Sequence, residues 1–262
     1  MEKKLKIGLA LGGGSARGFA HVGVIKVLEE AGIKVDYLSG CSMGALVGAF
    51  YASGARIQML ERFTRAIDRR NWVDLTFSKM GLISGNRIEQ ILYLMTRRST
   101  FDMLKIPLAV VAVDLYSGNK VVLKEGLVSR AVRASISIPG YFVPVEMDGM
   151  LLVDGGVLDR VPCEAVRDLG ADLVIAVDTG FYLARGKINS MIDVMARSFD
   201  IMGREISRTI LINADFVIKP DLECIAPSQF DKAREAIDLG EKAARVALPE
   251  LSAMLESRGV LA

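Results

Sequence analysis

Short apolar runs that stop at glycines and lead directly into helical patterns constrain this chain most. Residues 6–11 (KIGLAL) end at three consecutive glycines, and residues 16–31 then carry a helical pattern. Residues 35–39 and 43–52 repeat the order of apolar run, turn and helix. Two strands, each followed by a helix, predict a parallel sheet, because parallel neighbours need such a crossover.

The rest of the chain continues this alternation without a linker, repeat or low-complexity stretch. We therefore expect one α/β domain over residues 1–262. Residues 56–104 are predicted to be mostly helical with a loop at 80–85, either packed on the sheet or capping an apolar pocket with Trp72, Phe77 and Tyr93. Further strands are predicted at 108–115, 120–124, 151–153, 173–177 and 216–218, and long helices at 188–212 and 231–255.

Composition and charge exclude several classes of protein. Apolar residues make up 51% of the chain, and 33 basic and 31 acidic residues give a net charge of +2, so neither disorder nor nucleic-acid binding is expected. Cys41, Cys163 and Cys224 form no zinc-type pair and read as free thiols. Since His21 is the single histidine, we expect no His-rich metal site and no metal or other cofactor.

The sequence pattern predicts neither a signal peptide nor a membrane-spanning helix. The apolar run near the N-terminus covers only residues 7–11, too short for a signal peptide, and no apolar window of eighteen residues predicts a spanning helix. We expect a soluble, cytoplasmic protein, with peripheral contact at a membrane left open. The sequence does not determine the oligomeric state.

The glycine run GLALGGGSARG raises the question of nucleotide binding. It lacks the Lys of a Walker loop, and the GxGxxG pattern fails because Arg17 or Ser15 stands where glycine is needed. Bare amides at a helix N-terminus still suit a negative oxygen, either of a phosphate or of a tetrahedral intermediate. The alternative is that the glycines only allow strand and helix to pack closely.

The stretch GCSMG matches GxSxG, with a strand predicted before it and a helix after it. This context is that of a nucleophile elbow, in which Ser42 would be exposed at a sharp turn between the small residues Gly40 and Gly44. Cys41 is a rival nucleophile by chemistry, but it lies one residue off the apex and is expected to point into the fold.

A nucleophilic serine needs a base, and the inventory limits the choice. No histidine follows Ser42, so a Ser-His-Asp triad in the usual hydrolase order is excluded, and His21 fits a packing or hydrogen-bonding role. A carboxylate at the end of a strand can serve instead. Asp154 in LLVDGG is the first candidate, while Asp114 and Asp178 also end strands; the alternative for each of the three is to cap a turn or a helix N-terminus.

Together these motifs closely resemble the patatin-like phospholipase family in its small bacterial form, which is similar to the esterase domain of neuropathy target esterase. The likeness rests on GLALGGGSARGFAHVGVIKVLEE, GCSMGALVGA, RASISIPGYFVPV and the Asp-Gly-Gly turn at 154–156. It implies a three-layer α/β/α fold with a central, mostly parallel sheet. It also implies hydrolysis of lipid acyl esters through a Ser-Asp dyad and an acyl-enzyme.

The resemblance also implies roles for particular residues. Ser42 is the expected nucleophile and Asp154 the expected base, with Arg133 as a candidate headgroup contact. Ser15 stands where the family often has glycine, and Cys41 where it often has threonine. The remaining implied site residues are the oxyanion-hole amides of Gly13, Gly14 and Met43, the supporting loop residues Gly12, Arg17 and Gly18, the elbow glycines Gly40 and Gly44, and the turn glycines Gly155 and Gly156.

Two other functions stay open from the sequence. The first is a regulatory or nucleotide-binding protein that kept the fold without catalysis. The second is acyl transfer to an alcohol acceptor instead of water, with the same nucleophile.

Overall fold

The computed structural model describes residues 5–66, 74–76, 78–180, 188–189 and 191–260. Its main sheet has the strand order β10-β9-β1-β2-β4-β8-β7, and β5 pairs with β4. Pairing is parallel from β10 to β4 and antiparallel for β5, β8 and β7. These strands are β1 (Ile7–Leu11), β2 (Tyr37–Cys41), β4 (Leu108–Asp114), β5 (Lys120–Leu123), β7 (Val145–Met147), β8 (Met150–Asp154), β9 (Leu173–Val177) and β10 (Phe216–Ile218).

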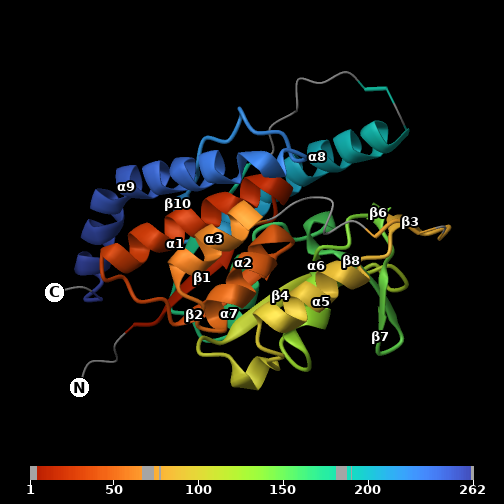
Figure 1. The fold of residues 1–262 in the computed structure, drawn as a ribbon. Helices are drawn as coiled ribbons and strands as arrows, with labels where there is room; N and C mark the ends of the chain where they lie inside the picture. Colours follow the sequence, from red (N-terminus) through yellow and green to blue (C-terminus); the bar gives the residue numbers. More distant parts are fainter. Residues whose placement is uncertain (1–4, 67–73, 77, 181–187, 190, 261–262) are drawn as a thin grey trace.

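Helices cover both faces of this sheet, which confirms the expected three-layer α/β/α fold (Figure 1). Leu9 and Leu11 of β1 point into the core shared with α1, α2 and α9, while Ala10 points to the face covered by α7. The helices are α1 (Ala20–Glu30), α2 (Met43–Ala52), α3 (Ile57–Ala66), α5 (Asn86–Met95), α6 (Val128–Ser135), α7 (Cys163–Asp168), α8 (Met191–Ile210) and α9 (Ala233–Ser257).

Three local expectations differ from the structure. The first helix is preceded by a 3-10 turn at Ser15–Phe19, so α1 begins later than predicted. The expected loop at 80–85 contains a strand, β3 (Gly81–Ile83), which pairs in parallel with β6 (Gly140–Phe142) as a second small sheet. Trp72 and Phe77, which were expected either to pack on the sheet or to cap an apolar pocket, lie outside the described residues.

The register of β4 explains how distant segments meet. Val110 to Val113 pair with β5 along one edge of β4, so the opposite edge is shared by β2 and β8. On that edge Cys41, the last residue of β2, lies opposite Val111, and Asp154, the last residue of β8, lies opposite Ala112. The C-terminal ends of β2 and β8 therefore meet along this edge of β4. Ser42, which follows β2, is placed beside the end of β8.

Within the described part of the chain, every helix is too short or too polar to cross a membrane.

Candidate active site

Ser42 stands at a strained turn between β2 and α2. Its backbone has φ 53° and ψ −122°, a conformation that costs on the order of 1–3 kcal/mol and recurs at functional sites. The neighbouring glycines make this turn sterically possible. A Cβ on Gly44 would lie 2.1 Å from the Leu11 carbonyl oxygen, and one on Gly40 would lie 2.5 Å from the Ala45 Cα.

A second serine, which the sequence analysis did not single out, secures the turn. The Ser42 amide donates to the Ser135 Oγ at 2.9 Å, and the Ser135 hydroxyl donates to the Val111 carbonyl oxygen at 2.6 Å. Ser135 is fully buried at the end of α6, so this connection is shielded from water. It ties the strained residue directly to β4.

Asp154 lies beside Ser42, as the meeting of β2 and β8 requires. The Ser42 side chain lies near enough to this carboxylate to lower its pKa, and the Gly156 amide donates to Asp154 Oδ1 at 2.8 Å. Both side chains are only 7% exposed. Burial raises the pKa of Asp154 above its usual value, against the opposing effect of these contacts. Gly155 allows the turn after Asp154 to pack closely against β4, because a Cβ at this position would lie 2.4 Å from the Val111 carbonyl oxygen.

The other strand-end aspartates cap turns. Asp114 accepts hydrogen bonds from the hydroxyl of Ser117 and from the amides of Leu151, Tyr116 and Ser117, and these lower its pKa to about 2. Asp178 accepts from the Gly180 amide at 2.9 Å. Of the three aspartates, Asp154 is the one that the structure brings to Ser42.

The amides of the glycine loop differ in whether they already donate hydrogen bonds within the fold. Contrary to expectation, the Gly13 amide is not open to an oxyanion, because it donates to the Arg160 carbonyl oxygen at 3.0 Å; the Gly12 amide donates to Val177 at 3.1 Å. Within the described residues, the amides of Gly14 and Met43 donate no hydrogen bond. These two N–H groups are therefore the better candidates for binding a negative oxygen.

Arg17 and His21 stabilise the glycine loop through hydrogen bonds to backbone carbonyl oxygens. The Arg17 Nε donates to the Ile225 carbonyl oxygen at 2.7 Å, and His21 Nε2 lies 2.7 Å from the Gly12 carbonyl oxygen. Complete burial lowers the pKa of His21 to about 4, so the ring is neutral at neutral pH and Nε2 donates. Gly18 is needed for packing, since a Cβ there would lie 2.4 Å from the Met43 Cγ. His21 thus has the structural role that its helical position indicated.

A cavity of about 290 Å³ opens above Ser42 and Asp154. Most of its wall is apolar, and α2, α5, the β3–β6 sheet and α8 contribute to it. Burial raises the pKa of Asp200 and lowers that of Arg160, which both line the cavity. The apolar wall includes Leu46, Ile83, Ile88, Ile138, Phe142 and Phe199.

Comparison with known proteins assigns the sequence to a family. A model described as patatin-like phospholipase matches residues 9–167, more than half of the chain. The chain belongs to the patatin-like phospholipase family. The matched range includes the glycine loop, the Ser42 elbow and Asp154.

Individual relatives agree with this family assignment. An NTE family protein of Mycobacterium tuberculosis is 38% identical over 175 residues, covering 66% of this chain and 48% of the relative. The human patatin-like phospholipase domain-containing protein 6 is 36% identical over 184 residues, covering 66% of this chain and 13% of the relative. The lysophospholipase nte1 of Aspergillus fumigatus is 36% identical, with 66% and 12% covered. The matched region thus spans less than half the length of each of these relatives.

Solved structures share the fold at low sequence identity. VipD from Legionella pneumophila has a TM-score of 0.68 at 15% identity, covering 95% of this chain and 67% of VipD. The type III effector ExoU has a TM-score of 0.53 at 13% identity, covering 95% and 53%.

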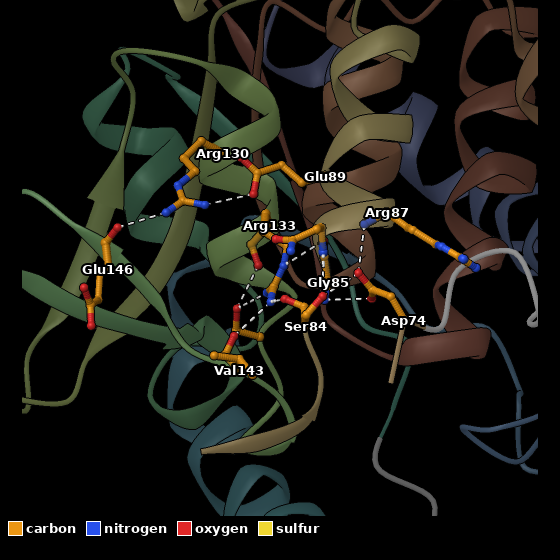
Figure 2. Close-up of polar contacts among 11 residues, drawn as sticks. Asp74, Ser84, Gly85, Arg87, Glu89, Arg130, Arg133, Val143 and Glu146 are labelled. Carbon is orange, nitrogen blue, oxygen red and sulfur yellow. Dashed lines mark hydrogen bonds and ion pairs between the residues drawn. The ribbon is translucent and has the colours of Figure 1, made fainter. Parts of the chain in front are cut away.

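Arg133, the candidate contact for a lipid headgroup, has a structural role instead. Its guanidinium donates to the carbonyl oxygens of Ser84, Gly85 and Val143 and to the Ser137 hydroxyl, as Figure 2 shows for the labelled residues. The side chain is buried and lies over the Phe142 ring. These contacts occupy the guanidinium, so the headgroup interpretation of Arg133 is wrong; Arg133 fixes the β3–β6 wall of the cavity.

No cluster of three or more His, Cys, Asp or Glu side chains suited to a metal ion occurs among the described residues.

Proposed function

We propose that this protein is a serine hydrolase of lipid acyl esters that works through a Ser42–Asp154 dyad. The observation that carries the proposal is the placement of a strained, buried serine beside a buried carboxylate beneath an apolar cavity. The family membership and a relative named lysophospholipase support a long-chain acyl ester, such as a lysophospholipid, as substrate.

In the proposed reaction Asp154 acts first as base and then as acid. The Ser42 hydroxyl gives its proton to the Asp154 carboxylate as Oγ attacks the ester carbonyl carbon. Asp154 returns this proton to the departing alkoxide, which leaves as the alcohol and forms the acyl-enzyme. A water then repeats the sequence, and the fatty acid is released. The raised pKa of Asp154 makes its carboxylate a stronger base than an exposed aspartate.

The developing negative oxygen needs donors, and the amides of Gly14 and Met43 are the proposed pair. One such donor contributes on the order of 3 kcal/mol to transition-state stabilisation. The apolar wall of the cavity accommodates the acyl chain and keeps water from the unreacted ester.

The nucleotide-binding alternative has less support. Phosphate loops present consecutive free amides, whereas the amides of Gly12 and Gly13 are used within the fold. Acyl transfer would use the same dyad, so only the products separate it from hydrolysis.

The decisive experiment combines fluorophosphonate labelling with a panel of acyl esters of increasing chain length. We expect the wild type to be labelled and to release fatty acid, while Ser42→Ala is not labelled and Asp154→Asn loses at least about a thousandfold in kcat/KM. Asp114→Asn is the matched control, because this strand-end aspartate caps a turn. Labelling that survives Ser42→Ala would refute the proposal. Transfer of the acyl group to glycerol in place of free fatty acid would identify a transferase.

A further inference from the structure

Cys41 is the one thiol that touches the proposed base. Its Sγ donates to Asp154 Oδ1 at 3.6 Å, the same oxygen that accepts from the Gly156 amide. The side chain is completely buried at the end of β2, where β2 and β8 meet. Its sulfur also fills the space beside Gly13, 3.5 Å from where a Cβ on that glycine would lie.

Burial decides the chemical state of this thiol. It raises the pKa of Cys41 well above its usual value, and the negative charge of Asp154 adds to the effect. The thiolate is the nucleophilic form of cysteine, so Cys41 remains an S–H donor and is a poor nucleophile. It lies next to the proposed nucleophile without competing with it.

We propose that Cys41 is a positioning residue, whose S–H group holds the Asp154 carboxylate in the orientation that receives the Ser42 proton. This inference rests on the proposed roles of Ser42 and Asp154. The Gly156 amide and the Cys41 thiol both donate to Oδ1, and two donors on one oxygen restrain the rotation of the carboxylate away from Ser42.

The hydrogen bond also has a consequence for pH. A donor to the ionised form stabilises that form, so the thiol keeps Asp154 deprotonated to lower pH than burial alone would allow. Among the described residues, the titratable groups that act on this carboxyl are Cys41 from β2 and Arg160 from the segment after β8. Arg160 is unchanged in the experiment below, so a shift would report the thiol.

Two variants of Cys41 distinguish its role as a hydrogen-bond donor from a role in packing alone. Cys41→Ala removes the donor, whereas Cys41→Ser keeps a donor of similar size. Cys163→Ala is the matched control, since Cys163 is also buried and its neighbouring charges are Asp159, Arg167 and Glu164.

The readout is the pH at which kcat/KM falls to half on the acid side. For Cys41→Ala we expect this midpoint to move to higher pH by about 0.5 to 1 unit, since one weak hydrogen bond to the carboxylate is lost. Cys41→Ser and Cys163→Ala should keep the wild-type midpoint. An unshifted profile for Cys41→Ala, or an upward shift for Cys41→Ser, would overturn the inference; the serine variant still decides if the alanine variant does not fold.

A direct titration separates failure of this inference from failure of the proposed function. The Asp154 carboxyl carbon can be followed by NMR in protein labelled with ¹³C-aspartate and assigned by comparison with Asp154→Asn. Its pKa should rise in Cys41→Ala even if no ester is hydrolysed. An unchanged Asp154 titration in active enzyme would refute the role of Cys41 alone, whereas an inactive wild type would refute the dyad.

Discussion

At the scale of single residues, the site depends on one strained serine and the groups that hold it. Ser42 has a positive φ and keeps its amide paired through Ser135 to the Val111 carbonyl. Since both serines are buried, these two hydrogen bonds satisfy polar groups that water does not reach; we call them the Ser135 relay. A small displacement of a nucleophile from its attacking geometry costs rate steeply.

We therefore predict that Ser135→Ala lowers kcat about tenfold or more with little change in KM. It should also reduce the free energy of unfolding by about 1–3 kcal/mol, because the Ser42 amide and the Val111 carbonyl lose their shared partner. Steady-state kinetics and urea unfolding measure the two effects. Ser129→Ala, another buried serine on α6, is the control for kcat. Equal kcat values in the two variants would argue against the relay.

At the scale of elements, the β3–β6 sheet forms a cavity wall that depends on Arg133. Gly81 pairs with Gly140 and Ile83 with Phe142, so the sheet is short and has few hydrogen bonds of its own. The planar guanidinium of Arg133 supplies several bonds at once, and lysine cannot reproduce this geometry.

Arg133→Lys is predicted to raise KM for long-chain esters several-fold while kcat for an acetyl ester stays within about twofold. The reason is that the wall loosens but Ser42 and Asp154 are not contacted. Arg130→Lys on the same helix is the matched control; Arg130 is half-exposed and paired with Glu89, so its loss should cost less than about 1 kcal/mol of stability. A uniform loss of kcat for both substrates would place Arg133 nearer to the chemistry than the structure does.

At the scale of the whole molecule, α9 closes the fold by crossing α1, which Figure 1 shows as the blue helix lying along the red one. Two glycines allow the close crossing. A Cβ on Gly240 of α9 would lie 2.1 Å from the Ala20 carbonyl oxygen, and one on Gly23 of α1 would lie 2.1 Å from the Ile237 carbonyl oxygen. Since Ala20 directly follows the glycine loop turn, this crossing also supports the site.

Gly240→Ala should reduce the free energy of unfolding by about 1–3 kcal/mol, although alanine favours helices, because the two backbones must separate. Gly48→Ala on α2 is the control, since its added methyl would meet only side chains at 3.4 Å or more and should be neutral or stabilising. Thermal unfolding of both variants tests this. An unchanged midpoint for Gly240→Ala would show that the helices can shift freely.

Most elements of the main sheet could be predicted from sequence, and the second sheet could not. Buried parallel strands such as β4 and β9 are continuous apolar runs, which local composition reveals. β3 is three residues long and pairs with β6 about sixty residues away, so neither strand carries a pattern of its own. The contacts of Arg133 depend on that pairing and were therefore misread.

The sequence by itself determined the elbow and the absence of a triad. GCSMG requires small residues around a sharp strand-to-helix turn, and a chain with one histidine upstream of Ser42 has no triad in the usual order. The strand-end pattern made Asp154 a first candidate without removing Asp114 and Asp178, and only the tertiary structure shows which of the three lies beside Ser42. Asp154 is the one at Ser42 since β2 and β8 share one edge of β4 and end against each other. Strand order and register are long-range properties, and no local pattern encodes them.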